Sequence, residues 1–134
     1  MSQLPLKNLP IDIQSFDKLI ENGCIYVDKT QHMYQLLKRG SNYFLSRPRR
    51  FGKSLLISTF HELFAGRRDL FKGLWIDSSD YVWAKYPVVH LDFSMVPCTT
   101  LAQFNAGLLL ALKRNAYAND ISMSPMCKET SRLC

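Results

Sequence analysis

The chain has 134 residues, 47% of them hydrophobic and 21% charged, which is the composition of one small globular domain. It contains no run of about 18 apolar residues, so a membrane-spanning helix is not expected, and residues 1–10 lack the apolar core of a secretory signal. The formal net charge of +6 suits an anionic partner, either a nucleotide or a nucleic acid, although the same charge would also simply aid solubility.

The first predicted element is a short helix. Phe16, Leu19 and Ile20 follow the i, i+3, i+4 spacing that places side chains on one face of a helix. The helix is therefore expected over residues 15–22, with Gly23 as its stop.

A second helix is expected after a brief β-prone segment, residues 24–27. Asp28 is predicted to be its N-cap, with Gln31 completing a capping-box-like pair and Gly40 ending the helix. Because Asp28 is charged and follows an apolar segment, a catalytic role is the alternative, but helix capping explains its position adequately.

The centre of the chain has the order strand, basic loop, helix. Residues 43–45 are apolar and are predicted to form the strand. Gly52-Lys53-Ser54 then match the end of the P-loop signature G-x-x-x-x-G-K-[ST]. Arg47 stands where that signature has its first glycine, so the match to the general pattern is incomplete.

The residue types of this loop suit a bound triphosphate. Gly52 lets the backbone approach an oxygen closely, and Lys53 would reach the β- and γ-phosphates. Ser54 would place its hydroxyl on Mg²⁺, while Arg49 and Arg50 offer planar donors to phosphate. The sequence therefore predicts a site for ATP and Mg²⁺. Its nucleotide-binding residues are expected to be Arg49, Arg50, Phe51, Gly52, Lys53, Ser54 and Leu55, with Ser54 as the metal ligand.

A second strand is predicted over residues 87–93, whose nearly continuous apolarity suits a sheet covered on both faces. Asp92 near its end is similar to the acid of a Walker B strand, which would hold Mg²⁺. The alternative is that Asp92 only closes a strand at a sheet edge. His90, within the strand, is expected to be a packed core residue.

The last predicted helix follows this strand. Thr99 or Thr100 is expected to cap it, and apolar residues recur along one face from Leu101 to Leu112. Beyond it, residues 118–134 are polar and irregular, and we expect them to be disordered.

The cysteines carry no metal-binding pattern. Cys24, Cys98, Cys127 and Cys134 contain no C-x-x-C spacing. Without a secretory signal, they are expected to be reduced thiols of a cytoplasmic protein.

Several motifs occur in an order that resembles one family. They are Tyr26-Val27-Asp28-Lys29-Thr30, Arg47-Pro48-Arg49-Arg50-Phe51-Gly52-Lys53-Ser54, Leu70-Phe71-Lys72-Gly73-Leu74 and Tyr86-Pro87-Val88-Val89-His90-Leu91-Asp92-Phe93. This order resembles the predicted AAA-ATPase-like family, mostly bacterial proteins, over about residues 4–115. That family's phosphate loop itself has an arginine where Arg47 lies, so the resemblance implies ATP binding. The glycine usual after Leu-Pro-Ile in the family is Asp12 here.

The resemblance also implies a fold, which is an α/β P-loop NTPase. We expect an AAA-like three-layer sandwich with a mostly parallel sheet, incomplete at its C-terminus. Residues 1–40 would be a helical lead-in, residues 41–117 the P-loop core and residues 118–134 the tail. Family members are longer, and many carry a nuclease-like C-terminal domain of the PD-(D/E)XK kind. The chain therefore looks like the N-terminal part of such a protein.

The same resemblance limits the expected activity. The family's Walker B strand, with paired acids, lies downstream of the strand that ends at Asp92, and residues 93–134 contain no such strand. We therefore expect ATP binding without complete hydrolytic machinery. Two alternatives stay open: a module whose loop contacts the phosphate backbone of a nucleic acid, and a non-functional remnant. An incomplete sheet would leave an open edge, which favours homo-oligomers.

Overall fold

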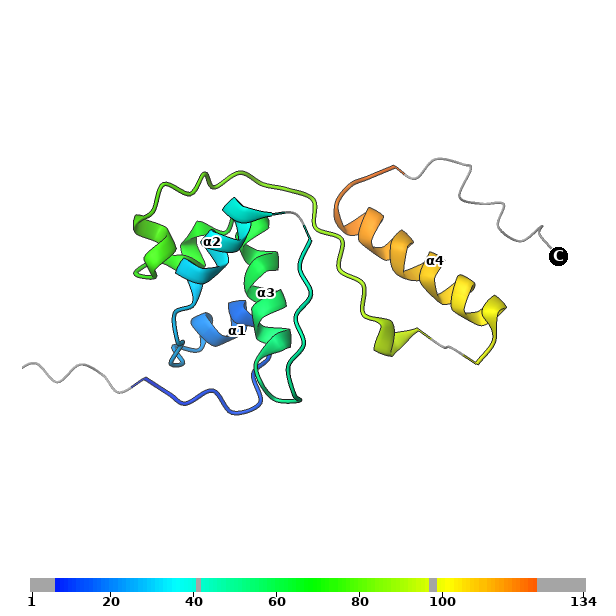
Figure 1. Ribbon diagram of the computed structural model, residues 1–134, viewed down its shortest axis with the longest axis horizontal. Coiled ribbons are helices and arrows are strands. Elements are labelled where there is room, and N and C mark those ends of the chain that lie inside the picture. Colours follow the sequence, from blue (N-terminus) through cyan, green and yellow to red (C-terminus); the bar gives the residue numbers. More distant parts are fainter. Residues whose placement is uncertain (1–6, 41, 97–98, 123–134) are drawn as a thin grey trace, which may run out of the picture. The chain divides into compact units, whose positions relative to one another are not determined.

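The computed structural model describes residues 7–40, 42–96 and 99–122, and the chain divides into two compact units, Met1–Tyr86 and Pro87–Cys134. Figure 1 shows the elements of each unit. The first unit contains α1 (Phe16–Glu21), α2 (Thr30–Arg39), α3 (Lys53–Phe64) and the 3₁₀ turns η1 (Arg68–Phe71) and η2 (Trp75–Ser78). The second contains the 3₁₀ turn η3 (Phe93–Met95) and α4 (Leu101–Ala118).

The helices form where their local signals predict them. Gly23 follows α1 with φ +61°, a left-handed conformation that glycine adopts without a steric penalty. The hydroxyl of Thr100 accepts a hydrogen bond from the Gln103 amide at 3.2 Å, which confirms Thr100 as the cap of α4. At α2 the prediction is wrong by one position. Its N-cap is Lys29, so Asp28 lies just outside the helix and does not form a capping box with Gln31.

One apolar core holds the first unit together. Phe16, Met33, Leu63, Phe71 and Ile76 are each at most 1% exposed, and they come from α1, α2, α3, η1 and η2 in turn. The rings of Phe16 and Phe71 lie 4.8 Å apart between centroids. Burying each side chain of this size contributes roughly 1.5–3 kcal/mol. All three helices and both turns therefore share one core.

The predicted α/β sandwich with a mostly parallel sheet is wrong for the described residues. Residues 43–45 and 87–91 run as extended segments without strand pairing, and an isolated parallel bridge joins Asn8 to Cys24. Both segments have the apolar composition of strands, but composition only favours an extended backbone. A sheet also requires a second segment at hydrogen-bonding distance, which the local pattern does not specify. Phe44, on the first segment, is 94% exposed.

Two further predictions meet the structure only in part. Cys24 is buried and its thiol is free, whereas Cys98, Cys127 and Cys134 lie outside the described residues. Of the expected disordered tail over 118–134, Ala118 is the last residue of α4 and Asn119 is its C-cap, whereas residues 123–134 lie outside the described residues. Among the helices that the structure describes, none is long and apolar enough to cross a membrane.

Candidate functional site

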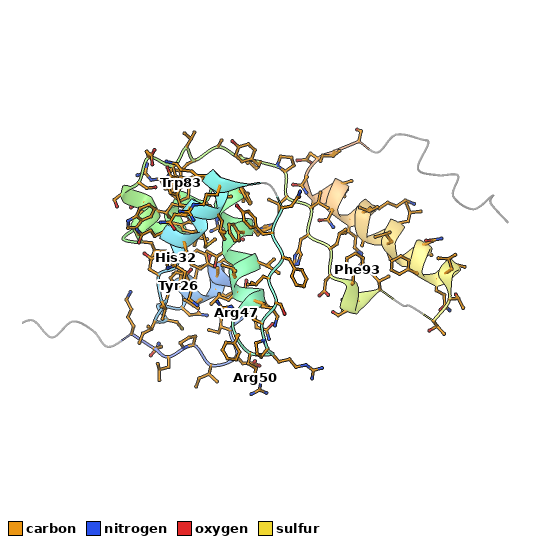
Figure 2. The ribbon with its side chains drawn as sticks, viewed as in Figure 1. Tyr26, His32, Arg47, Arg50, Trp83 and Phe93 are labelled. Atoms are coloured by element: carbon orange, nitrogen blue, oxygen red, sulfur yellow. The ribbon has the colours of Figure 1, made fainter. Side chains whose placement is uncertain are left out.

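The basic loop before α3 turns sharply just ahead of the helix. Arg50 has φ +65° and Gly52 has φ +72°, so two backbone positions in close succession are left-handed. Gly52 adopts this conformation freely, whereas a residue with a Cβ, such as Arg50, is strained by roughly 1–2 kcal/mol. Figure 2 places Arg47 and Arg50 on this loop. The two turns bring the loop backbone around to the first turn of α3.

The start of α3 is open to an anion. Gly52 is the N-cap and has no side chain to satisfy the first amides. The Leu56 amide donates to the Gly52 carbonyl at 2.9 Å, but within the described residues the amides of Lys53, Ser54 and Leu55 have no acceptor. Free amides at the positive end of a helix dipole form a ready site for phosphate.

The Lys53 side chain folds back over this loop. Its ammonium donates to the carbonyl oxygens of Arg47 and Pro48, the latter at 2.7 Å. These contacts hold a positive charge against the loop and satisfy two carbonyls that lie side by side in sequence. The ammonium is thus already at the loop where a phosphate would meet it.

A cavity of about 790 Å³ lies at the junction of the loop and α3, and we call it the loop cavity. Of the seven predicted nucleotide-binding residues, all but Phe51 line it. They are Arg49, Arg50, Gly52, Lys53, Ser54 and Leu55. Phe51 instead lines a second, mostly apolar cavity of about 450 Å³, together with residues that include Tyr26, His32 and Arg47. The structure therefore brings most of the predicted site around one hollow.

Sequence reasoning missed the other wall of the loop cavity. Residues 10–14 line it, and among them Asp12 has φ +57°. The available signal was the family's usual glycine at this position, because a left-handed backbone favours glycine. In this chain the turn forms with an aspartate, a residue type that tolerates this conformation better than most.

Asp28 serves as a structural clamp. Its carboxylate accepts hydrogen bonds from the Thr30 amide at 2.8 Å, the Thr30 hydroxyl at 2.7 Å and the Trp75 amide at 2.7 Å. Burial alone would raise the pKa of Asp28, but the bonds from Trp75 and Thr30 outweigh it and hold the pKa below its usual value. The Thr30 hydroxyl in turn accepts from the Ile76 amide at 3.2 Å. Asp28 and Thr30 together tie α2 to η2.

Asp92 and His90 lie in the second unit. The carboxylate of Asp92 accepts from the Ser94 hydroxyl at 2.6 Å and from the Ser94 amide at 2.9 Å, and these bonds lower its pKa. Asp92 thereby caps η3. It does not close a strand at a sheet edge, because segment 87–91 has no strand pairing within the described residues. His90 is exposed, so the prediction of a packed core histidine is wrong.

Metal-ligating groups are sparse in the part of the chain that the structure describes. It contains no cluster of three or more histidine, cysteine, aspartate or glutamate side chains that would hold a metal ion. Ser54 is exposed at the first turn of α3 and lines the loop cavity. A single hydroxyl suits Mg²⁺ where phosphate oxygens and water supply the remaining ligands.

A basic loop that ends in Gly-Lys-Ser, followed by an uncapped helix start, is typical of the P-loop class of phosphate-binding domains. The chain belongs to the predicted AAA-ATPase family, whose sequence model matches residues 10–131. An uncharacterized protein in the vnfD 5′ region of Azotobacter chroococcum mcd 1 is 49% identical over 89 residues. These cover 65% of this chain but only 17% of that protein. No solved structure matches the chain.

Proposed function

We propose that the chain binds ATP together with Mg²⁺ at the loop cavity. The observation that carries this proposal is the convergence of six predicted site residues on one cavity, at a helix start whose first amides are free. Membership of the predicted AAA-ATPase family supports it. The chain covers only 17% of its relative from Azotobacter chroococcum. The activity of the whole protein is therefore also a proposal.

Each residue of the loop has a proposed role. The amides of Ser54 and Leu55 would donate to phosphate oxygens, and Gly52 leaves room for the phosphate to approach them. Lys53 would exchange its bonds to the loop carbonyls for bonds to the phosphates. The charged-pair bonds it would gain are shorter and stronger than those to neutral carbonyls. Arg49, which is exposed at the cavity, would neutralise further phosphate charge.

The two walls of the loop cavity suit the two ends of a nucleotide. Arginine, lysine and free amides lie on the side of the loop, whereas Pro10, Ile11 and Ile13 present apolar groups from the N-terminal segment. We place the triphosphate on the loop side and the base against these apolar residues. Ser54 would supply one ligand to Mg²⁺, which bridges phosphate oxygens and reduces their charge.

We propose nucleotide binding rather than complete hydrolysis for these residues. Asp28 and Asp92 are engaged in structural hydrogen bonds, and the loop cavity contains one acid, Asp12, among its described lining residues. Hydrolysis also needs a group that orients the attacking water. We place the protein in the bacterial cytoplasm, a reducing compartment in which the free thiol of Cys24 would persist.

The proposal is tested by titrating a fluorescent ATP analogue into the unmodified chain, Lys53→Ala and Lys85→Ala, with Mg²⁺ present. Lys85 is exposed and does not line the loop cavity, so its variant controls for the loss of one positive charge. Losing a hydrogen bond to a charged group should weaken binding about tenfold or more in Lys53→Ala. Lys85→Ala should bind as the parent does. Equal affinities for all three proteins would refute the site.

A second candidate function is contact with the phosphate backbone of a nucleic acid. The exposed side chains of Arg47, Arg49 and Arg50 and the net charge of +6 favour it. It predicts that affinity for a DNA duplex falls steeply with salt and is indifferent to ATP. Titrating DNA at two salt concentrations, each with and without excess ATP, separates the two functions. Displacement of DNA by ATP would indicate that both ligands use the same loop.

A further inference from the structure

In the second unit, side-chain amides of α4 bind the backbone of the extended segment 87–91. Figure 1 shows the backbone of α4 and of this segment. The Asn119 amide accepts from the Val88 N–H at 2.9 Å and donates to the Val88 carbonyl at 2.9 Å. The Asn115 amide does the same at His90, at 2.8 and 2.9 Å. Each asparagine therefore satisfies both backbone groups of one residue.

The orientation of both amides is fixed by a further bond. The Asn115 nitrogen also donates to the Ala111 carbonyl at 2.9 Å, and the Asn119 nitrogen donates to the Asn115 carbonyl at 2.8 Å. The nitrogen of a side-chain amide can only donate, and here it donates to two carbonyl oxygens. The amide oxygen therefore faces the N–H of the segment. Both side chains are half-buried. The pair is thus held in place by α4 itself.

The spacing of the two asparagines matches that of a strand. Four residues of helix rise about 6.0 Å, and two residues of strand rise about 6.6 Å. An i, i+4 pair on a helix can therefore reach positions i and i+2 of an extended segment, whose N–H and C=O groups point to the same edge. In a sheet, peptide groups of a neighbouring strand occupy this position.

We propose that Asn115 and Asn119 take the place of a neighbouring β-strand, forming a backbone-binding site that closes one edge of segment 87–91. The opposite edge, formed by the N–H groups of Val89 and Leu91, has no acceptor among the described residues. With Asn115 and Asn119 bound along one edge, segment 87–91 can form strand hydrogen bonds only along its other edge. Exposed strand edges pair with other chains, so closing one of them restrains self-association.

Residue-resolved amide hydrogen exchange on the full chain tests whether Asn115 and Asn119 bind the backbone of segment 87–91. In the unmodified protein, the amides of Val88 and His90 should exchange about tenfold more slowly than those of Val89 and Leu91, as expected for one hydrogen bond of about 1.4 kcal/mol. This alternation needs no variant. Four amides that exchange at similar rates would overturn the proposal.

Two variants then assign the effect to single side chains. Asn115→Ala should raise the exchange rate of the His90 amide about tenfold while the Val88 amide stays slow, and Asn119→Ala should do the reverse. Asn105→Ala, an exposed asparagine on the same helix, should change neither amide. If Asn115→Ala leaves His90 protected, the asparagine does not act as a strand substitute.

The double variant tests the consequence for association. Asn115→Ala combined with Asn119→Ala should raise the fraction of dimers and larger species in sedimentation velocity, whereas Asn105→Ala should not. Circular dichroism shows whether α4 is retained in the double variant. A double variant that keeps its helix and stays as monomeric as the parent would overturn the proposed closing of the edge.

Discussion

The ammonium of Lys53 donates to the carbonyl oxygen of Pro48 at 2.7 Å, so this lysine is hydrogen-bonded to the basic loop that precedes its own helix. Pro48 has no N–H to offer a phosphate, but its carbonyl is free to accept. The lysine also donates to the carbonyl of Arg47, the residue that stands at the first glycine position of the P-loop signature. A phosphate bound by the Lys53 ammonium would have to replace this hydrogen bond to the Pro48 carbonyl.

Asp12→Gly should stabilise the protein. Asp12 has φ +57°, a conformation that disfavours any residue with a Cβ, and glycine removes that strain. The greater freedom of glycine in the unfolded chain offsets part of the gain, so a net increase of about 0.5–1 kcal/mol in the free energy of unfolding is expected. Urea denaturation measures it.

Asp12→Ala is the matched control for that change. It removes the carboxylate but keeps the Cβ, so the backbone strain remains and no stabilisation should follow. Equal stabilities of the glycine and alanine variants would mean that the left-handed turn at residue 12 is not strained.

The stability of the first unit should fall at acid pH through Asp28. The pKa of Asp28 is lowered in the folded state, so its contribution is fully present above the unfolded value of about 3.9 and is lost as the pH falls through the lower folded value. Asp28→Asn should lose stability at pH 7, because the amide nitrogen cannot accept from Trp75 or Thr30. Its free energy of unfolding should also change less between pH 6 and pH 3 than that of the parent.

Asp69→Asn serves as the comparison for Asp28. It removes the same charge from a side chain that is 61% exposed and pairs with Arg67 at 3.4 Å, so it should cost less stability at pH 7. If Asp28→Asn keeps the full pH dependence of the parent, the clamp on Trp75 does not exist in solution.

Two phenylalanines should respond in opposite ways to truncation. Phe71 is fully buried in the core of the first unit, and Phe71→Ala should lower the free energy of unfolding by about 3–5 kcal/mol. Phe44 is 94% exposed, so Phe44→Ala should have an effect of about 0.5 kcal/mol or less. Chemical denaturation followed by tryptophan fluorescence compares the two. A large loss in Phe44→Ala would show that segment 43–45 is packed, as in the sheet that the sequence predicts.

Local patterns predicted the helices and the loop well. The spacing of Phe16 and Leu19 placed α1, and Thr100 marked the start of α4. Gly52 and Lys53 located the turn before α3 and the residues that line the loop cavity. These features depend on residues within one or two turns of each other, so a single sequence contains the information for them.

The prediction of a sheet was wrong because strand pairing, unlike helix formation, depends on residues far away in the sequence. Segments 43–45 and 87–91 were predicted from their own composition, but pairing depends on what lies beside them. Likewise, Asp28 was assigned to the helix that follows it, whereas its second oxygen binds Trp75, which lies 47 positions away. The asparagine contact at His90 spans 25 positions and replaces a strand with a helix.

By itself, the sequence determined that helices form near α1, α2 and α4 and that a basic loop precedes α3, because helix spacing, caps and left-handed glycines are local properties. Only the tertiary structure decided that Asp12 and the N-terminal segment form the far wall of the loop cavity, and that α4 rather than a strand binds segment 87–91. Those outcomes depend on hydrogen bonds and packing between distant residues. Their free energies are settled by the whole arrangement rather than by any one stretch of the chain.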